Sequence, residues 1–322
     1  MRHLIRAWLL VLLAAAWPPA VLAQTYPNRP VRVVYPFPPG GGDSVVRLFC
    51  ERLSQALGQP VVLDHRGGAG GNIGADAVAK SPADGYTLLM GTNGALAVNP
   101  TLYQKMSFDP QTDFVPISNF VAAPQVLFVN KDVPANSLKE LIALAKAKPG
   151  SLTYASVGQG SASHLTMELF KSLTGTEITH VPYKGAGPAI TDVLGGQVSM
   201  MVVIAGSALP HVKAGTVKAL AITSARPSAL VPGVPTMAEA GVTGMEATAW
   251  FALVAPAGTP RDVVARLHAE TGRFLTDPAI RERINQLGFE PTPSTPEEAA
   301  AMMRRERELW GKVIKATGAR VD

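Results

Sequence analysis

The chain has 322 residues, of which 47% are hydrophobic and only 16% are charged, and its formal net charge is +5. A chain of this size and composition can bury a substantial core, which favours two domains or lobes and excludes a largely disordered protein. The small positive surplus is scattered along the chain, so it does not indicate binding to nucleic acid.

The first residues have the layout of a secretory signal peptide. Basic side chains precede an apolar run from Ala7 to Ala16, and small residues lead up to Ala23. A membrane anchor is the alternative, but Pro18 and Pro19 interrupt the run before the roughly 20 apolar residues that a spanning helix needs. We therefore predict a signal peptide over residues 1–23, cleavage after Ala23 and export to the periplasm.

The mature chain alternates between strand and helix patterns. The first set predicts a strand at 31–37, a helix from Asp43 to Leu57, a strand at 61–63, a helix up to about Lys80 and a strand at 87–90. These three strands are expected to lie parallel in one sheet. A second set follows, with helices at 138–147, 164–173 and 188–194 and strands at 152–155, 178–183 and 198–204.

Two further apolar segments are expected to connect the sets. The first, from Phe114 to Val129, is broken by Pro116 and Pro124, which suits an extended crossing segment more than a regular central strand. The second, from Trp250 to Ala255, leads into helices that run to the C-terminus. The predicted fold is α/β, with two open, mostly parallel sheets and a ligand cleft between two lobes. The first lobe takes 24–123 and 248–322, and the second takes 124–247.

Four glycine-bearing turns are expected to face this cleft, because small ligands bind at the carboxyl ends of strands in open α/β sheets. The turns span residues 37–43, 91–94, 156–164 and 183–187. Glycine permits close approach of a ligand, and free N–H groups at helix starts favour a carboxylate or phosphate. Each turn alone is weak evidence, since glycine also closes ordinary tight turns.

Several segments resemble the Bug family, the periplasmic solute-binding proteins of tripartite tricarboxylate transport systems. The resemblance spans nearly the whole mature chain. It is carried by the loop 35–41, the run 66–74, the segment Asp84-Gly85-Tyr86-Thr87-Leu88-Leu89, the turn from Gly160 to Leu165, the stretch Val181-Pro182-Tyr183-Lys184-Gly185, and Pro235-Thr236-Met237-Ala238-Glu239-Ala240-Gly241.

The resemblance implies a type II-like periplasmic binding protein that closes over a small carboxylated solute and passes it to a membrane permease. In that family the carboxylate is held largely by backbone amides, small hydroxyl side chains and ordered waters. Carried over to this sequence, the first lobe would contact the ligand through Phe37, Pro39, Gly40, Thr92, Asn93 and Gly94. The second lobe would contribute Ser156, Gly158, Ser161, His164, Tyr183, Lys184, Gly185, Ala205 and Gly206, the last two at the end of a strand.

Some of these assignments have alternatives. The first glycine loop departs from the family pattern, because Gly42 alone separates Gly41 from the following aspartate where two residues are usual. His164 fits a packing role at a helix start as well as ligand contact. Lys184 beside a glycine turn is as often solvated, and Tyr183 fits a domain core as well as a cavity wall.

An exported enzyme that acts on a small carboxylate is the main rival, because α/β folds with clefts also support catalysis. The sequence has no Gly-x-Ser-x-Gly, His-Glu-x-x-His or phosphate-loop motif. Its widely spaced histidines and single cysteine, Cys50, form no metal-ligand pattern. A sensor subunit of a signalling system is a third candidate. We expect no cofactor, no metal and a monomer.

The identity of the solute is not encoded in these motifs. Tricarboxylates, dicarboxylates, acidic amino acids and aromatic acids all fit a site built from backbone amides. The candidate turns contain no arginine, and each buried charge of a ligand needs strong paired donors. The sequence therefore favours a mono- or dicarboxylate.

Overall fold

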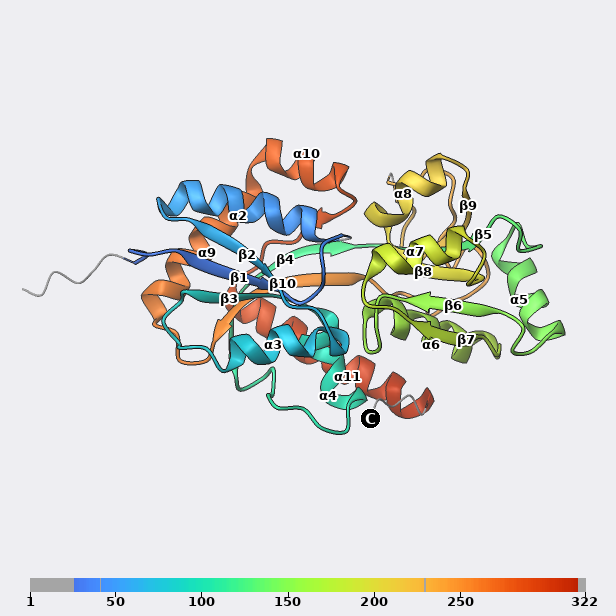
Figure 1. The fold of residues 1–322 in the computed structure, drawn as a ribbon, viewed down its shortest axis with the longest axis horizontal. Helices are drawn as coiled ribbons and strands as arrows, with labels where there is room; N and C mark the ends of the chain where they lie inside the picture. The colour runs from blue at the N-terminus through green and yellow to red at the C-terminus, as the bar shows by residue number, and fades with distance from the viewer. Residues whose placement is uncertain (1–25, 41, 229, 318–322) are drawn as a thin grey trace, which may run out of the picture.

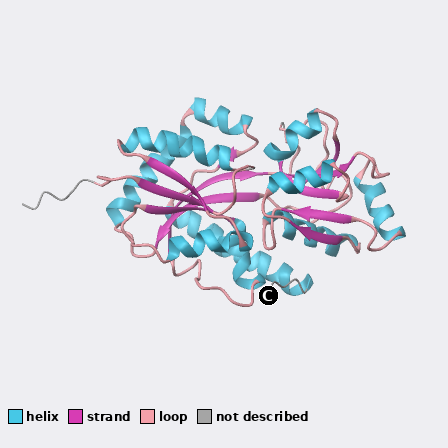
Figure 2. Ribbon diagram, viewed as in Figure 1, coloured by secondary structure: helices cyan, strands magenta, loops and turns pink. Residues whose placement is uncertain are grey.

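The computed structural model describes residues 26–40, 42–228 and 230–317, and the predicted signal peptide, residues 1–23, lies outside them. Two α/β lobes lie side by side, as Figures 1 and 2 show, and each is built on one sheet with helices on both faces. Within the described ranges, no helix combines the length and apolar character needed to cross a membrane.

The first lobe contains a six-stranded sheet in the order β11-β4-β10-β3-β1-β2. Its strands are β1 (Val31–Tyr35), β2 (Val61–His65), β3 (Thr87–Thr92), β4 (Phe114–Ala123), β10 (Ala249–Pro256) and β11 (Glu290–Pro291). The predicted parallel core is confirmed, since β1 pairs in parallel with both β2 and β3. The strands β10, β4 and β11 extend this core with antiparallel ladders, so the sheet is mixed and the expectation of a mostly parallel sheet is wrong.

Helices cover both faces of this sheet. One face carries α2 (Asp43–Leu57), α9 (Arg261–Thr276) and α10 (Pro278–Gln286), and the other carries α3 (Asn72–Ala79) and α11 (Pro296–Thr317). Short helices η1 (Ala69–Gly71), η2 (Gly94–Val98) and α4 (Asn99–Leu102) lie in the connections. Successive side chains of β1 point to opposite faces of the sheet. Val33 therefore packs against the layer of α2, α9 and α10, and Val34 packs against the layer of α3 and α11.

The second lobe has a five-stranded sheet in the order β7-β6-β8-β5-β9. Its strands are β5 (Gln125–Asn130), β6 (Thr153–Ser156), β7 (Thr179–Pro182), β8 (Met200–Ile204) and β9 (Val217–Ile222). The strand β6 pairs in parallel with β7 and β8, whereas β5 runs antiparallel to β8 and β9. The helices are α5 (Leu138–Ala147) and α6 (Ala162–Thr174) on one face, and α7 (Ala186–Leu194) and α8 (Ala205–Lys213) on the other.

The crossing between the lobes follows the predicted path, but its strands are more regular than expected. Pro124 lies between β4 and β5, and both strands have a neighbour on each side. The segment is extended and crosses between the lobes as predicted, but the expectation that it would not form central strands is wrong. Pro116 is accommodated in β4 beside a register shift in its pairing with β10, and proline in a sheet is tolerated at such irregularities.

The segment after β8 also differs from the prediction. Ala205 and Gly206 do not end a strand, because they form the first turn of α8. The apolar run of β8 continues without a break into Ala205, so the sequence contains no visible boundary, and Pro210 inside α8 weakens the helical pattern further. This correction matters because α8 begins at the edge of the sheet that faces the first lobe.

Candidate ligand-binding site

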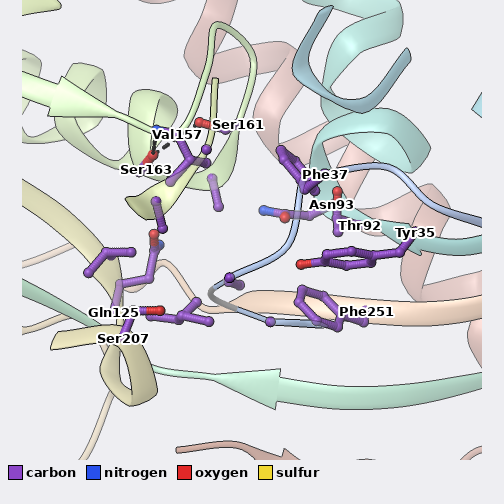
Figure 3. A pocket seen from close by; sticks show the side chains of 18 of the residues that line it. Tyr35, Phe37, Thr92, Asn93, Gln125, Val157, Ser161, Ser163, Ser207 and Phe251 are labelled. Carbon is purple, nitrogen blue, oxygen red and sulfur yellow. Dashed lines mark hydrogen bonds between the residues drawn. The ribbon is translucent and has the colours of Figure 1, made fainter. Parts of the chain in front are cut away.

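A cavity of about 580 Å³, its open mouth included, lies between the two lobes. Figure 3 shows side chains from both lobes facing each other across it. Among the described residues, those that line it include no Asp, Glu, Lys, Arg or His. They are Tyr35, Phe37, Pro38, Gly40, Gly42, Thr92, Asn93, Gln125, Val157, Ser161, Ala162, Ser163, Gly185, Ala186, Val203, Ile204, Ser207, Ala249 and Phe251.

The second-lobe wall is the edge of a sheet at which three helices begin. The helices α7, α6 and α8 follow β7, β6 and β8, which are neighbours in that order. The carboxyl ends of these parallel strands meet at one edge. Because β5 runs antiparallel, it starts at this same edge, where Gln125 pairs with Ile204. The elements at this edge are therefore, in order, the starts of α7, α6 and α8 and then Gln125.

The helices α6 and α7 direct their N-terminal turns at the cavity. Ala162 and Ser163 of α6 and Ala186 of α7 line it. The first N–H groups of a helix have no partner inside the helix, and they carry the positive end of the helix dipole. Two such ends beside one cavity form a donor set suited to a carboxylate or another small anion.

The loop before α6 is fixed by its own hydrogen bonds, two of which are drawn in Figure 3. The Val157 amide donates to Ser163 Oγ at 3.0 Å, and the two hydroxyls of Ser161 and Ser163 lie 3.0 Å apart. Ser161 Oγ also donates to the Gly158 carbonyl at 2.6 Å. This arrangement holds the turn in shape, so that a ligand does not have to order it.

Two stacked histidines lie behind this loop. The rings of His164 and His180 are 4.3 Å apart, and Tyr154 stacks on the far face of His180. The Gly160 amide donates to His164 Nδ1, and His180 Nε2 is 2.7 Å from Ser156 Oγ. Burial lowers the pKa of His164 to about 4. Burial, followed by the effect of His164, lowers the pKa of His180 to about 3, so both rings are neutral near pH 7.

The helix α8 also begins at this edge, and Ser207 in its first turn lines the cavity. The Ala205 amide donates to the Pro124 carbonyl at 2.9 Å. The Leu287 carbonyl oxygen of the first lobe lies against Gly206, so close that a Cβ atom on Gly206 would collide with it. The start of α8 is therefore in contact with the first lobe.

Gln125 presents an acceptor rather than a donor at this end. Its Nε2 donates to Thr166 Oγ1 at 2.7 Å and to the Ala247 carbonyl at 3.2 Å. A carbonyl oxygen only accepts hydrogen bonds, so the contact with Ala247 fixes which end of the amide is nitrogen. Among the described residues, Oε1 is left without a hydrogen-bond partner. Gln125 is only 1% exposed and lines the cavity.

Two hydroxyls that line the cavity also have no partner among the described residues. They are Thr92 Oγ1, at the end of β3 in the first lobe, and Ser207 Oγ, in the first turn of α8. A buried polar atom without a hydrogen bond costs stability, so such atoms usually have a functional explanation. Here they supply hydrogen-bonding capacity on both sides of the cavity.

The rest of the first-lobe wall is aromatic and glycine-lined. The Tyr35 ring lies 5.8 Å from those of Phe37 and Phe251, and Figure 3 shows all three on one side of the cavity. Gly42 packs directly against Phe251 and Tyr35. At the start of α2, Asp43 accepts a hydrogen bond from the Gly40 amide and pairs with Arg47. The Asp43 carboxylate therefore already occupies the start of α2.

Six of the residues carried over from the resemblance line the cavity, and nine do not. The lining ones are Phe37, Gly40, Thr92, Asn93, Ser161 and Gly185. Those outside the lining are Pro39, Gly94, Ser156, Gly158, His164, Tyr183, Lys184, Ala205 and Gly206.

The predicted polar side chains that do not line the cavity have other partners or face solvent. Ser156 contacts His180 and Gly158, and His164 accepts from a backbone amide. The Tyr183 hydroxyl donates to Asp192 at 2.6 Å, and Lys184 is exposed. His164 thus has the packing role given as its alternative, and Lys184 faces solvent as its alternative had it. Tyr183 is partly buried and is held by Asp192.

Two glycines from outside the lining, Gly94 and Gly206, lie with Gly160 where the lobes touch. Gly94 packs on the Gly160 carbonyl, and Gly206 on Leu287 and Gly288. Gly158 has no such interlobe contact, since its nearest neighbour is the Tyr183 carbonyl within its own lobe, so the interlobe set is Gly94, Gly160 and Gly206. At these positions glycine permits close approach of the two backbones.

Several lining residues were not predicted from the sequence. Gln125 and Ser207 were missed because the crossing was not expected to form central strands and α8 was not recognised. Tyr35 and Phe251 read as ordinary core positions in apolar strands. Gln125 did carry a signal, since it is a polar residue directly after Pro124 at the start of an apolar run.

Comparisons with known proteins agree with this architecture. Residues 45–319 match the family described as the tripartite tricarboxylate transporter family receptor. BugT from Bordetella pertussis is 41% identical over 94% of this chain and 93% of its own. A protein from R. palustris solved with adipate is 40% identical, with a TM-score of 0.89 over 92% of this chain and all of its own.

The periplasmic binding protein BugD is 36% identical, with a TM-score of 0.87 over 92% of this chain and 99% of its own. The predicted resemblance and the two-lobed fold are thereby confirmed. The chain belongs to the family of receptors of tripartite tricarboxylate transporters.

Proposed function

We propose that this protein is a periplasmic receptor that binds one small carboxylate-bearing solute between its lobes and delivers it to a membrane permease. The proposal is supported by the pair of helix N-termini, α6 and α7, directed at a cavity that no charged side chain lines in the described part of the chain. Backbone N–H groups and helix dipoles favour an anion there without an arginine. Adipate in the related R. palustris protein agrees with a carboxylate ligand.

Closure of the lobes over the ligand supplies the mechanism. The first lobe, proposed as residues 24–123 and 248–322, already touches the second, residues 124–247, at several points. Tyr103 donates to the Gln159 carbonyl at 3.2 Å, and Pro38 packs against Gly185. A ligand that contacts both lobes favours this closed arrangement over an open one.

We also propose that the protein is a monomer without enzymatic activity. In the cavity wall, the Ser161 and Ser163 hydroxyls bond to each other and to the backbone. The neighbouring His164 accepts from a backbone amide, so neither serine has this imidazole as a base. No group of three metal-ligating side chains occurs among the described residues. Capture of a solute requires neither an activated serine nor a metal ion.

A panel of small carboxylates tests the proposal by thermal shift and titration calorimetry on the mature chain, residues 24–322. A ligand that binds only the folded state must raise the melting temperature. We expect saturable stabilisation and no product in the same samples. Product formation would favour an enzyme, and failure of every carboxylate would contradict the proposed function. Ligand-dependent capture of a signalling protein in place of a permease would favour a sensor.

Ala186→Asp locates the anion site, and Ala186→Asn is its matched control. Ala186 is the first residue of α7 and lines the cavity. An aspartate there suits the helix N-terminus, so the protein should fold, but its charge competes with the ligand carboxylate. We expect at least tenfold weaker binding for the aspartate variant than for the neutral asparagine variant of the same shape. Equal affinities would place the carboxylate elsewhere.

A further inference from the structure

The loop that precedes α6 touches the first lobe with its backbone. Tyr103, directly after α4, donates to the Gln159 carbonyl at 3.2 Å. The next carbonyl, that of Gly160, lies against Gly94. Gly70 on η1 lies so close to Gln159 that a Cβ atom on it would collide with the carbonyl oxygen. Two successive carbonyls of this loop therefore meet the first lobe, and the position of the loop decides whether these contacts form.

A buried amide fixes the first-lobe side of this contact. Asn99 Nδ2 donates to the Gly70 carbonyl at 3.2 Å and to Asn72 Oδ1 at 2.6 Å, which ties α4 to η1 and to the start of α3. Asn99 is fully buried, and its Oδ1 lies against Gly160 with no hydrogen-bond partner among the described residues. The first lobe thus presents a preformed surface that fits closely against a glycine backbone.

On the second-lobe side, His164 holds the backbone of Gly160. The Gly160 amide donates to His164 Nδ1 at 3.2 Å, and this hydrogen bond is buried. The acceptor lies in the first turn of α6, and the next residue, Leu165, belongs to one apolar cluster with Leu102 and Trp310 of the first lobe. Without an acceptor the amide would be buried and unpaired, which costs free energy. The loop would then shift toward another partner, and its carbonyls would lose their contacts with the first lobe.

We propose that His164 is a positioning residue for closure of the lobes. It does not line the cavity, but it holds Gly160 so that the loop carbonyls meet the first lobe when the lobes close. The residues next to the contacting glycines, Asn93 and Ser161, line the cavity, so the contact aligns the two cavity walls. Its contribution to affinity does not depend on which solute is bound. The inference rests on the proposed function, since it assumes that the solute is bound in the closed arrangement.

Two substitutions of His164 test the role of its acceptor. His164→Leu removes the acceptor, whereas His164→Asn places an amide oxygen near the position of Nδ1. We expect His164→Leu to bind about tenfold more weakly than the wild type, and His164→Asn to bind at least about threefold more tightly than His164→Leu. The probes for titration calorimetry are adipate, hexanoate and the tightest-binding acid of the carboxylate panel. The loss should be the same factor for every probe that binds.

Equal affinities of the wild type and His164→Leu would overturn the inference and leave the proposed function intact. The inference would also be wrong if His164→Asn bound no better than His164→Leu, or if the loss differed from one probe to the next. If no carboxylate binds the wild type, the proposed function itself fails.

Tyr103→Phe tests whether His164 acts through the loop, because it removes the interlobe hydrogen bond from the other lobe. We expect about threefold to tenfold weaker binding in the wild-type background and less than about a twofold effect in the His164→Leu background, since coupled contacts are not additive. Tyr86→Phe is the matched control. It removes a hydroxyl that bonds to Asn28 Oδ1 at the end of β3 away from the cavity, and it should leave affinity unchanged in both backgrounds.

Tyr103 is only half-buried, so its variant should fold even if His164→Leu does not. Wild-type affinity in Tyr103→Phe would overturn the inference by itself. Equal effects of Tyr103→Phe in the two backgrounds would do the same, because His164 would then act on the second lobe alone and not through the contact between the lobes.

Discussion

The stacked pair His164 and His180 shows how single residues shape the site without touching its cavity. Both rings are neutral at pH 7 because burial lowers their pKa values to about 4 and about 3. Glu168 and Lys171 on α6 face the pair as an ion pair at 2.7 Å, and Tyr154 covers it from β6. Protonation of either ring would place an uncompensated charge beneath the loop that precedes α6.

This arrangement predicts a loss of stability in mildly acidic solution. Unfolded histidines have a pKa near 6.5, so below that pH the unfolded chain takes up protons that the folded chain refuses. The stabilising contribution of the neutral pair is complete above pH 6.5 and is lost as the pH falls toward about 4 and about 3. Melting temperatures measured from pH 7.5 to 5 should therefore decrease.

His180→Phe provides the comparison, since it keeps a flat ring in the stack and removes one titrating group. The variant should show a shallower dependence of melting temperature on pH between 6.5 and 5, a range above the ordinary pKa of carboxylates. If melting temperature depended on pH equally in the variant and the wild type, titration of His180 would not be the cause of the loss of stability.

At the residue scale, the sequence predicted types of chemistry better than individual contacts. Ser161 and Gly185 were identified by their place in glycine-bearing turns, and both line the cavity. His164 and Tyr183 occur in the same turns, but hydrogen bonds to the backbone and to Asp192 hold their side chains. The direction of a side chain in a turn depends on such tertiary partners, which a single sequence does not reveal.

At the scale of elements, the βαβ units were predictable because their apolar periods are strong. The helix predicted at 138–147 coincides with α5, and the one expected at 164–173 lies within α6. The extended crossing was predicted, but its central place in both sheets and the helix α8 were not, since proline argued against each and the compensating bulge and packing are tertiary. The acceptor end of the cavity is built from these unpredicted elements.

The start of α8 gives a test of lobe contact at this scale. Gly206→Ala should favour the helix, because alanine has the higher helix propensity, and Gly206 does not have a positive φ. In the closed arrangement the added methyl group would collide with the Leu287 carbonyl oxygen. We expect the variant to fold and to bind ligand at least tenfold more weakly, as titration calorimetry would show.

Gly272→Ala is the matched control for this test. Gly272 lies inside α9, and a Cβ atom there would meet nothing within 4 Å. The Gly272→Ala variant should gain a similar amount of stability from helix propensity, and its affinity for ligand should stay at the wild-type level. If Gly206→Ala also kept wild-type affinity, the contact between α8 and Leu287 would not belong to the ligand-bound state.

At the scale of the whole molecule, the two lobes divide the work of recognition. The second lobe supplies the helix ends and the polar acceptors, and the first lobe supplies the aromatic wall of Tyr35, Phe37 and Phe251. Neither lobe encloses the cavity alone, so binding and closure are coupled. The family resemblance and the two-lobed fold were evident in the sequence, whereas the uncharged lining of the cavity required the structure.

The proposed function requires that backbone donors bind a carboxylate between the lobes. The most direct test is to titrate the mature protein with its tightest-binding acid and with the primary amide of the same acid. The two compounds have nearly the same shape, but only the acid is charged. We predict that the amide binds at least about thirtyfold more weakly, or about 2 kcal/mol, as expected for loss of charge-assisted hydrogen bonds. Equal affinities of acid and amide would contradict the claim.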